Sequence, residues 1–318
     1  MSEIFKVSIN DFKTDSGAVY SSLDLFYQHF GKDYSTAPVV LVNHSLTGDS
    51  NVSGNNGWWT EIIGPGMTID TNYYSVLAFN IPGNGYDGVY IKNYRDFITK
   101  DIAKLFLHVL LEMKITDAHA LVGGSVGGEI VWEMACLKPN LFKIIVPIAA
   151  DWKASDWLIA NCKLQENILL NSNNPIFDAR MHAMISYRTP LSFEFRYNRR
   201  KSIEKDLFEV EDWLIYHGNL LKNKFTVDSY LLMNQILKTV DTSDGNNSIK
   251  SLEKISSKIE ILDVDSDILF PPEFGYKTYK ELNKKGLNVN YNLIKSIYGH
   301  DSFLIENEQV NNIFRKIL

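Results

Sequence analysis

Short apolar runs of strand length recur along the chain and predict a buried sheet. Most of them are continuous rather than alternating, which is typical of strands that are buried on both faces of a parallel sheet. Six such strands are expected, at residues 39–42, 74–79, 118–122, 143–149, 258–264 and 289–294. Residues 5–9 and 23–28 precede them and look like two further strands, arranged as an antiparallel hairpin.

Segments with helical periodicity lie between the expected strands. In residues 101–115, apolar side chains recur at i, i+3, i+4, i+7, i+8 and i+11, which places them on one face of a helix. Alternation of strands and helices predicts an α/β fold built in layers.

The alternation stops between about residues 152 and 240, where one helical segment follows another. We expect four helices there, at residues 157–170, 176–187, 207–216 and 228–239. A polar, turn-rich stretch follows, and the strands resume near residue 251. The simplest organisation is one α/β core, formed by residues 1–151 and 246–318, with a helical lid inserted at residues 152–245.

The segment Gly123–Gly128 contains the pattern Gly-x-Ser-x-Gly between an expected strand and an expected helix at residues 129–137. A sharp strand-to-helix turn strains the backbone at its serine, and glycines on either side remove side chains that would clash there. We therefore predict Ser125 as a nucleophile at the carboxyl edge of the sheet. The alternative is an ordinary glycine-rich turn.

A serine hydroxyl needs a base, and in this architecture the partners follow in the order Ser, Asp or Glu, His. His300 comes after the last expected strand, in a loop from which it could reach the serine. Of Asp263, Asp265 and Asp267, only Asp267 lies clearly past its strand, so we predict that Asp267 orients the imidazole. By itself, such an aspartate is more often a turn residue.

A second glycine pattern, Gly-x-Gly-x-x-Gly at residues 83–88, also follows a strand. A dinucleotide site would require a helix that opens at once and an acidic residue at the end of the next strand. Here Pro82 precedes the pattern, and the next element is the helix at residues 101–115. A flexible turn at the rim of the pocket is the better interpretation.

Composition and charge narrow the class of protein. The chain has 318 residues, of which 45% are hydrophobic and 22% charged, and a net charge of −6 argues against a nucleic-acid partner. We expect no membrane segment, because the longest uncharged apolar stretch, residues 144–150, is far too short. Cys136 and Cys162 cannot form a disulfide framework or a four-thiolate zinc site. With no apolar leader at the N-terminus, these features predict a cytoplasmic protein without a metal site.

The motifs around the predicted triad resemble the homoserine O-acetyltransferase family of α/β-hydrolase-fold acyltransferases. The likeness is collinear and spans most of the chain. It is carried by His44-Ser-Leu-Thr-Gly-Asp49, Gly57-Trp-Trp59, Gly123-Gly-Ser-Val-Gly-Gly128, Ala179-Arg-Met181, Ser186-Tyr-Arg188, Asp228-Ser-Tyr-Leu231, Leu269-Phe-Pro-Pro272 and Tyr298-Gly-His-Asp-Ser-Phe-Leu304.

The resemblance implies an α/β-hydrolase fold, with a mostly parallel central sheet and an inserted helical lid. It also implies ping-pong acetyl transfer from acetyl-CoA to L-homoserine, a step of methionine biosynthesis, with acetyl-CoA as co-substrate and no bound cofactor. Ser125 would carry the acetyl group, and His300 would activate first Ser125 and then the homoserine hydroxyl. The backbone N–H groups of Leu46 and Val126 would form the oxyanion hole.

By the same resemblance, Arg180 and Tyr187 would bind the carboxylate of the amino acid, and Asp301 would bind its ammonium group. A guanidinium suits a carboxylate, and an acidic side chain beside the catalytic histidine suits a cation. Without the resemblance, Arg180 is better interpreted as a solvated or salt-bridged helix residue. The family likeness also implies a homodimer packed through the lid; the alternative is that the lid aromatics face the core.

Several alternatives stay open at this point. The same triad could serve a carboxylesterase that acts on small esters, or the fold could be a catalytically inactive interaction module. The lid lacks a histidine in Asp241-Thr-Ser-Asp244, where the family has Asp-x-His-Asp, and the chain is shorter than typical members. The sequence does not show whether the acyl donor is acetyl-CoA or succinyl-CoA. It also does not show whether the acceptor is homoserine or serine, which differ by one methylene group.

Overall fold

In the computed structural model, which describes residues 3–318, the strands form one eight-stranded sheet and a small two-stranded pair. Residues 1 and 2, which the predicted core range includes, lie outside the described residues. The order of the large sheet is β1-β2-β6-β3-β7-β8-β9-β10. Its strands are β1 (Ile4–Lys13), β2 (Val19–Gly31), β3 (Val39–Asn43), β6 (Ser75–Phe79), β7 (Ala118–Gly124), β8 (Phe142–Ile148), β9 (Lys258–Val264) and β10 (Val289–Ile294). The small pair is β4 (Ile63–Gly64) and β5 (Ile69–Asp70).

The mostly parallel sheet expected from the sequence is confirmed. Strands β6, β3, β7, β8, β9 and β10 pair in parallel, whereas β1 pairs with β2 and β2 with β6 in the antiparallel sense. Every residue of β3 and β6 is buried, which explains why these strands appear in the sequence as continuous apolar runs.

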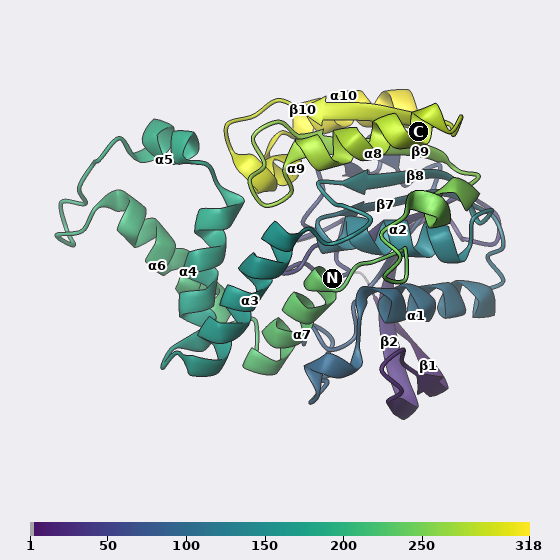
Figure 1. The fold of residues 1–318 in the computed structure, drawn as a ribbon, viewed down its shortest axis with the longest axis horizontal. Helices are drawn as coiled ribbons and strands as arrows, with labels where there is room; N and C mark the ends of the chain where they lie inside the picture. Colours follow the sequence, from purple (N-terminus) through teal and green to yellow (C-terminus); the bar gives the residue numbers. More distant parts are fainter. Residues whose placement is uncertain (1–2) are drawn as a thin grey trace.

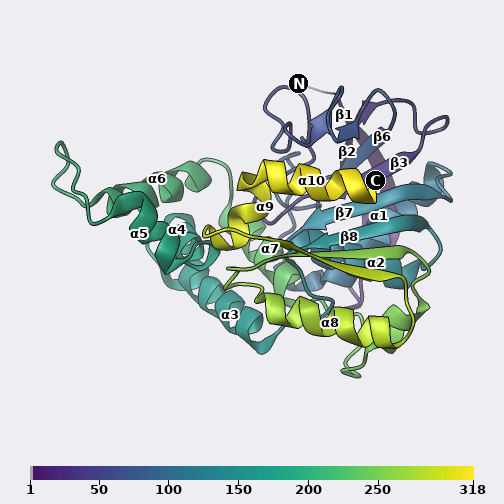
Figure 2. The same cartoon turned by 90° about the horizontal axis from the view of Figure 1, so that it is seen from above.

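Helices cover both faces of the sheet. One face packs α1 (Thr99–Glu112), α2 (Val126–Leu137) and α8 (Pro272–Lys284), and the other packs α10 (Asn307–Ile317). Figure 2 shows α8 and α10 on opposite sides of the strands. In α10, Val310, Phe314 and Ile317 lie at i, i+4 and i+7, and all three are buried against the sheet.

Five helices lie between β8 and β9: α3 (Asp156–Asn171), α4 (Pro175–Tyr187), α5 (Pro190–Tyr197), α6 (Glu209–Lys222) and α7 (Val227–Lys238). They gather at one end of the sheet, with α5 and α6 farthest from the core (Figure 1). The sequence did not predict α5. Its signal is the pair Thr189-Pro190, in which the Thr189 hydroxyl accepts a hydrogen bond from the N–H of Ser192 and Pro190 occupies the first helical position.

Short helical turns complete the chain, namely η1 (Tyr94–Asp96), η2 (Ile249–Lys254), η3 (Gly299–Asp301) and α9 (Ser302–Ile305). Within the described residues, no helix combines the length and the apolarity that a bilayer span requires. The strands β3, β7, β8 and β9 are parallel, so their carboxyl ends meet at one edge of the sheet, and loops that follow different strands converge there. Helix α4 of the lid contacts η3 at this edge.

Candidate active site

Ser125 stands between the end of β7 and the start of α2. Its backbone has φ 57° and ψ −129°, a conformation that a non-glycine residue adopts only under strain. The neighbouring glycines are required by close packing, because a Cβ on Gly127 would lie 2.5 Å from the carbonyl oxygen of Asn43 and a Cβ on Gly123 would collide with the backbone of Gly127. The turn is therefore a strained elbow that presents Ser125 at the carboxyl edge of the sheet.

Asp267 and His300, which are far from Ser125 in the sequence, are hydrogen-bonded to each other. Nδ1 of His300 donates to Oδ2 of Asp267 at 2.7 Å. The other carboxylate oxygen accepts the backbone N–H groups of Leu269 and Phe270 at 2.8 and 2.9 Å. Because Nδ1 is engaged, Nε2 is the nitrogen left to exchange a proton with a reacting group. Asp265 bonds elsewhere, to the N–H of Ser296.

The imidazole of His300 is buried among aromatic rings, close to the carboxylates of Asp267 and Asp301. Its ring lies 5.3 Å from Phe270, 5.6 Å from Tyr187 and 5.8 Å from Phe303, measured between centroids. Burial alone would lower the pKa of His300, but the charge of Asp267, the hydrogen bond to it and the charge of Asp301 outweigh burial. The pKa of His300 is therefore raised above the usual histidine value.

The loop after β3 is braced by His44. Nδ1 of His44 donates to the carbonyl oxygen of Ser45 at 2.8 Å, and Nε2 accepts the N–H of Ile81 at 3.0 Å. Burial lowers the pKa of this histidine, which keeps it neutral and able to make both bonds. The backbone that leads into Leu46 is thus held in one conformation beside the elbow.

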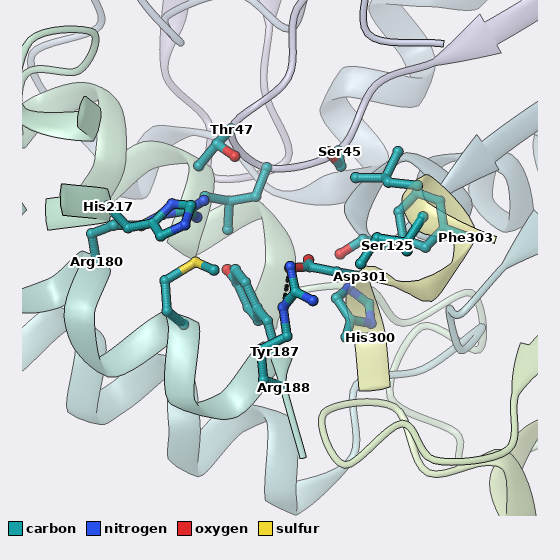
Figure 3. Close-up of a pocket in the computed structure, with 14 residues that line it drawn as sticks. Ser45, Thr47, Ser125, Arg180, Tyr187, Arg188, His217, His300, Asp301 and Phe303 are labelled. Carbon is teal, nitrogen blue, oxygen red and sulfur yellow. Dashed lines mark ion pairs between the residues drawn. The ribbon is translucent and has the colours of Figure 1, made fainter. Parts of the chain in front are cut away.

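Ser125 and His300 line a cavity of about 210 Å³ beneath the lid. Figure 3 shows both side chains in its wall, with Arg180, Tyr187 and Arg188 of the lid facing them. The residues that line the cavity are Ser45, Leu46, Thr47, Ser125, Arg180, Met184, Tyr187, Arg188, His217, His300, Asp301, Phe303, Leu304 and Ile305. Two of the predicted site residues do not line the cavity. Asp267 lies behind His300, to which it is hydrogen-bonded, and Val126 is the first residue of α2, directly after Ser125.

Arg180 projects from α4 into this cavity. Its guanidinium carbon lies 5.7 Å from the centroid of the Tyr187 ring. Nη1 of Arg180 is buried and has no hydrogen-bond partner among the described residues. A buried charged donor without a partner is costly, so this atom is suited to bind an anionic group of a ligand.

Asp301 is already paired. Nε of Arg188 lies 3.1 Å from Oδ2 of Asp301, and the dashed line in Figure 3 marks this contact. Arg188 has no role that could be predicted from the sequence, and no sequence pattern indicates that the end of α4 meets the loop after β10. The packing of α4 of the lid against η3 of the core brings these two side chains together.

His217 of α6 is a second cavity residue that the sequence did not single out. Its ring packs 4.5 Å from the Trp213 ring, centroid to centroid. Burial, together with the positive charges of Arg180, Arg188 and Arg196, lowers the pKa of His217 to about 4. A neutral imidazole next to three guanidinium groups indicates that the lid side of the cavity is electropositive.

The pattern at residues 83–88 serves the fold rather than the cavity. None of these residues is among those that line it. Gly83, Gly85 and Gly88 all have positive φ, and the side chains of Asn80 and Asn84 hydrogen-bond to each other across the turn. The segment is a turn, as expected, although it does not reach the rim. Across the described residues, no cluster of three or more His, Cys, Asp or Glu side chains is arranged to hold a metal ion.

Several curated proteins similar to this chain are named homoserine O-acetyltransferase. The homoserine O-acetyltransferase of Methanococcoides burtonii is 29% identical, over 97% of this chain and 72% of that protein. The homoserine O-acetyltransferase of Moorella thermoacetica is 27% identical, over 96% of this chain and 92% of that protein. These relatives confirm the resemblance that the sequence motifs indicated.

Solved structures with the same fold include both acetyltransferases and esterases. Homoserine O-acetyltransferase from Bacillus anthracis superposes with a TM-score of 0.89 at 18% identity, over 99% of this chain and 97% of that one. Esterase E22 superposes with a TM-score of 0.89 at 16% identity, over all of both chains. At these identities the likeness establishes the fold alone.

A family model described as the α/β-hydrolase fold matches residues 38–304. That span contains the parallel strands from β3 to β10, the lid helices, the strained elbow at Ser125 and the bonded pair Asp267 and His300. The chain is therefore a member of the α/β-hydrolase-fold family.

Proposed function

We propose that this protein is a homoserine O-acetyltransferase, which moves an acetyl group from acetyl-CoA to the hydroxyl of L-homoserine. The observation that carries the proposal is the charge arrangement in the cavity of Ser125. Nη1 of Arg180 has no hydrogen-bond partner in the described part of the chain, and Asp301 lies across the cavity beside His300. A zwitterionic amino acid presents the carboxylate and ammonium that these two groups would bind. Curated relatives named homoserine O-acetyltransferase support the same conclusion.

The first half-reaction forms an acetyl-enzyme. Nε2 of His300 takes the hydroxyl proton as Oγ of Ser125 attacks the thioester carbonyl, and Asp267 stabilises the imidazolium. The backbone N–H groups of Leu46 and Val126 hold the tetrahedral oxyanion. The carbon–sulfur bond breaks, the proton on His300 passes to the sulfur, and CoA leaves as the free thiol.

The second half-reaction transfers the acetyl group. Arg180 and Tyr187 hold the carboxylate of L-homoserine, and Asp301 binds its ammonium group. Nε2 of His300 takes the proton of the substrate hydroxyl, whose oxygen attacks the ester carbonyl. The bond to Oγ then breaks, the proton returns to Ser125, and O-acetylhomoserine leaves. Acetyl-CoA acts as co-substrate, and the chemistry requires no resident cofactor.

Product analysis tests transfer against hydrolysis. Purified protein is supplied with acetyl-CoA and L-homoserine, and the amounts of thiol, O-acetylhomoserine and acetate are measured together. We expect thiol and O-acetylhomoserine in equal amounts, with little acetate. Acetate as the main product, and fast turnover of simple esters that is indifferent to L-homoserine, would instead identify a carboxylesterase of the same fold.

Arg180→Ala is expected to impair the second half-reaction selectively. A hydrogen bond to a charged group contributes roughly 1.5–3 kcal/mol, so kcat/KM for L-homoserine should fall about 10- to 100-fold. Acetylation of the enzyme by acetyl-CoA, followed as the first burst of thiol, should stay close to the wild-type rate. Arg196→Ala is the matched control, because Arg196 also adds positive charge near His217 but does not line the cavity. Equal losses in both half-reactions would show that Arg180 has a different role.

The acylation step should depend on pH through His300. Only the neutral imidazole accepts the proton of Ser125, so the rate rises with pH as His300 deprotonates. Because Asp267 and Asp301 raise the pKa of His300, the midpoint of this rise should lie above about 6.5, the usual histidine value. Single-turnover thiol release between about pH 5 and 9 measures it. A midpoint below the usual value would contradict the electrostatic account of the triad.

We also propose a homodimer that packs through the lid, in the cytoplasm. Large apolar side chains are exposed on consecutive lid helices, among them Ile185, Leu191, Phe195, Tyr216 and Leu220. These helices stand away from the sheet in Figure 1, so a second copy could cover them without blocking the core. Both cysteines are free thiols, which fits a reducing compartment. Light scattering in solution distinguishes a dimer from a single chain of 36.3 kDa.

A further inference from the structure

The carboxylate of Asp301 is paired with a cation of the protein. Its carboxylate lies 3.1 Å from Nε of Arg188, and the two side chains are only 20% and 14% exposed. At this burial, solvent and salt screen the pair much less than they screen a surface pair. The carboxylate that the proposed function assigns to the ammonium of the acceptor is therefore occupied by a cation of the protein itself.

Arg188 has other partners that keep it in place. Its guanidinium carbon lies 5.7 Å from the Trp213 ring centroid and 5.8 Å from that of Tyr298. Although Nε lies close to Asp301, it makes no aligned hydrogen bond among the described residues, so charge attraction rather than a directional bond holds the pair. Because its guanidinium lies over two aromatic rings, Arg188 can keep its position when Asp301 binds another cation.

The acceptor and Arg188 therefore compete for one carboxylate. An acceptor with an ammonium group gains Asp301 only by displacing Arg188 from it. An acceptor that lacks the amino group leaves the ion pair intact, and its carboxylate does not face an unpaired negative charge. Compared with a cavity in which Asp301 has no partner, Arg188 therefore lowers the affinity for amino acids. It raises the affinity for hydroxy acids, because their carboxylate does not meet an unpaired negative charge.

We propose that Arg188 is a specificity-determining residue, which acts through Asp301 to limit how strongly the enzyme prefers an α-amino acid over a hydroxy acid that lacks the amino group. This inference rests on the proposed function for the identity of the acceptor. Arg188 is distinct in role from Arg180, whose Nη1 has no hydrogen-bond partner within residues 3–318 and remains available to the carboxylate.

A second consequence concerns His300 and does not depend on the acceptor. The charged groups near the imidazole are Asp267 and Asp301 on the core side and Arg180 and Arg188 on the lid side. The Tyr187 ring also contacts the imidazole, tilted at 46° to it. The charge of Asp301 raises the pKa of His300. The positive charge of Arg188 lies 3.1 Å from the Asp301 carboxylate, and a cation at that distance offsets the field of the carboxylate. Removing Arg188 should therefore move the pH dependence of acylation to higher pH.

Arg188→Met tests the proposal, since methionine keeps the apolar stem and removes the charge. We compare kcat/KM for L-homoserine with that for 4-hydroxybutanoate, which has the same hydroxyl and carboxylate but no amino group. The ratio should rise about tenfold in the variant. With p-nitrophenyl acetate as a chromogenic acyl donor, the rise of the acylation rate with pH should shift upward by about half a unit.

Two further variants control for charge and packing. Arg188→Lys keeps a cation beside Asp301 and should restore both the wild-type ratio and the wild-type pH dependence. Arg196→Met removes a positive charge that lies 5.8 Å from the same Trp213 ring but is not paired with Asp301, and it should change neither.

Equal losses with both acceptors and an unshifted pH dependence in Arg188→Met would overturn the inference, because Arg188 would then bind the carboxylate directly or only support the fold. The same changes in Arg196→Met would also overturn it, since they would reflect net charge alone. If the wild-type protein does not acetylate L-homoserine, the proposed function fails, yet the ester assay still decides the role of Arg188: a shift supports its coupling to Asp301, and no shift contradicts it.

Discussion

Replacing Ser125 by alanine is expected to reduce turnover by about 10⁵-fold or more, the scale of loss when a serine enzyme of this kind loses its nucleophile. The elbow holds the hydroxyl of Ser125 at a strained backbone position. Its neighbours in the chain, Gly124 and Val126, have no side-chain group that could act as the nucleophile instead. The folded structure should be unaffected, since alanine accepts the same backbone. Release of thiol from acetyl-CoA and formation of O-acetylhomoserine measure the loss.

Ser45 supplies a matched control for that experiment. It is the other serine that lines the cavity, and its hydroxyl is the kind of group that could be mistaken for the nucleophile. Ser45→Ala keeps the backbone that leads into Leu46, so most of the activity should remain. If Ser125→Ala kept turnover and Ser45→Ala lost it, the nucleophile would be misassigned.

The second large effect is expected for Asp267→Asn. The carboxylate accepts the Nδ1 proton of His300 and two backbone N–H groups. An amide can keep the two backbone bonds but presents an NH₂ group to Nδ1, which forces the imidazole into the tautomer whose Nε2 already carries a proton. That imidazole cannot act as a base, and the corresponding change in another triad lowers kcat about 10⁴-fold. Steady-state rates with acetyl-CoA and L-homoserine measure the effect.

Asp265→Asn controls for removing a charge at the same edge of the sheet. Asp265 lies two residues away and bonds to the N–H of Ser296 rather than to His300, so its amide variant should keep nearly all activity. Unfolding by urea should show that both variants remain folded. An Asp267→Asn protein with near-normal rates would mean that another group orients the base.

The elbow could be predicted because its signals are local. Gly123, Ser125 and Gly127 are close in sequence, and the strand before them and the helix after them follow from periodicity in the same stretch. Asp267 and His300 could be predicted from chain order, since each follows a segment that the sequence identifies as a strand. The hydrogen bond between the two side chains could not be predicted, because spacing in the sequence does not show which side chains are in contact.

The contacts between lid and core could not be predicted. Arg188 stands at the end of α4 and Asp301 in η3, and nothing in either segment indicates the other. His182 of α4 and His217 of α6 both lie in helical segments, yet only His217 lines the cavity, and the packing of the lid helices decides which of the two side chains faces inward. The missed helix α5 is short, and its cap at Thr189 was a readable local signal.

Intact-protein mass spectrometry tests the central claim most directly. The protein is mixed with acetyl-CoA alone and then given L-homoserine, and the adduct is located by peptide mapping. The account predicts one acetyl group per chain, on Ser125, which disappears as O-acetylhomoserine forms. An adduct on another residue, or transfer to homoserine by a protein that never carries the acetyl group, would contradict it.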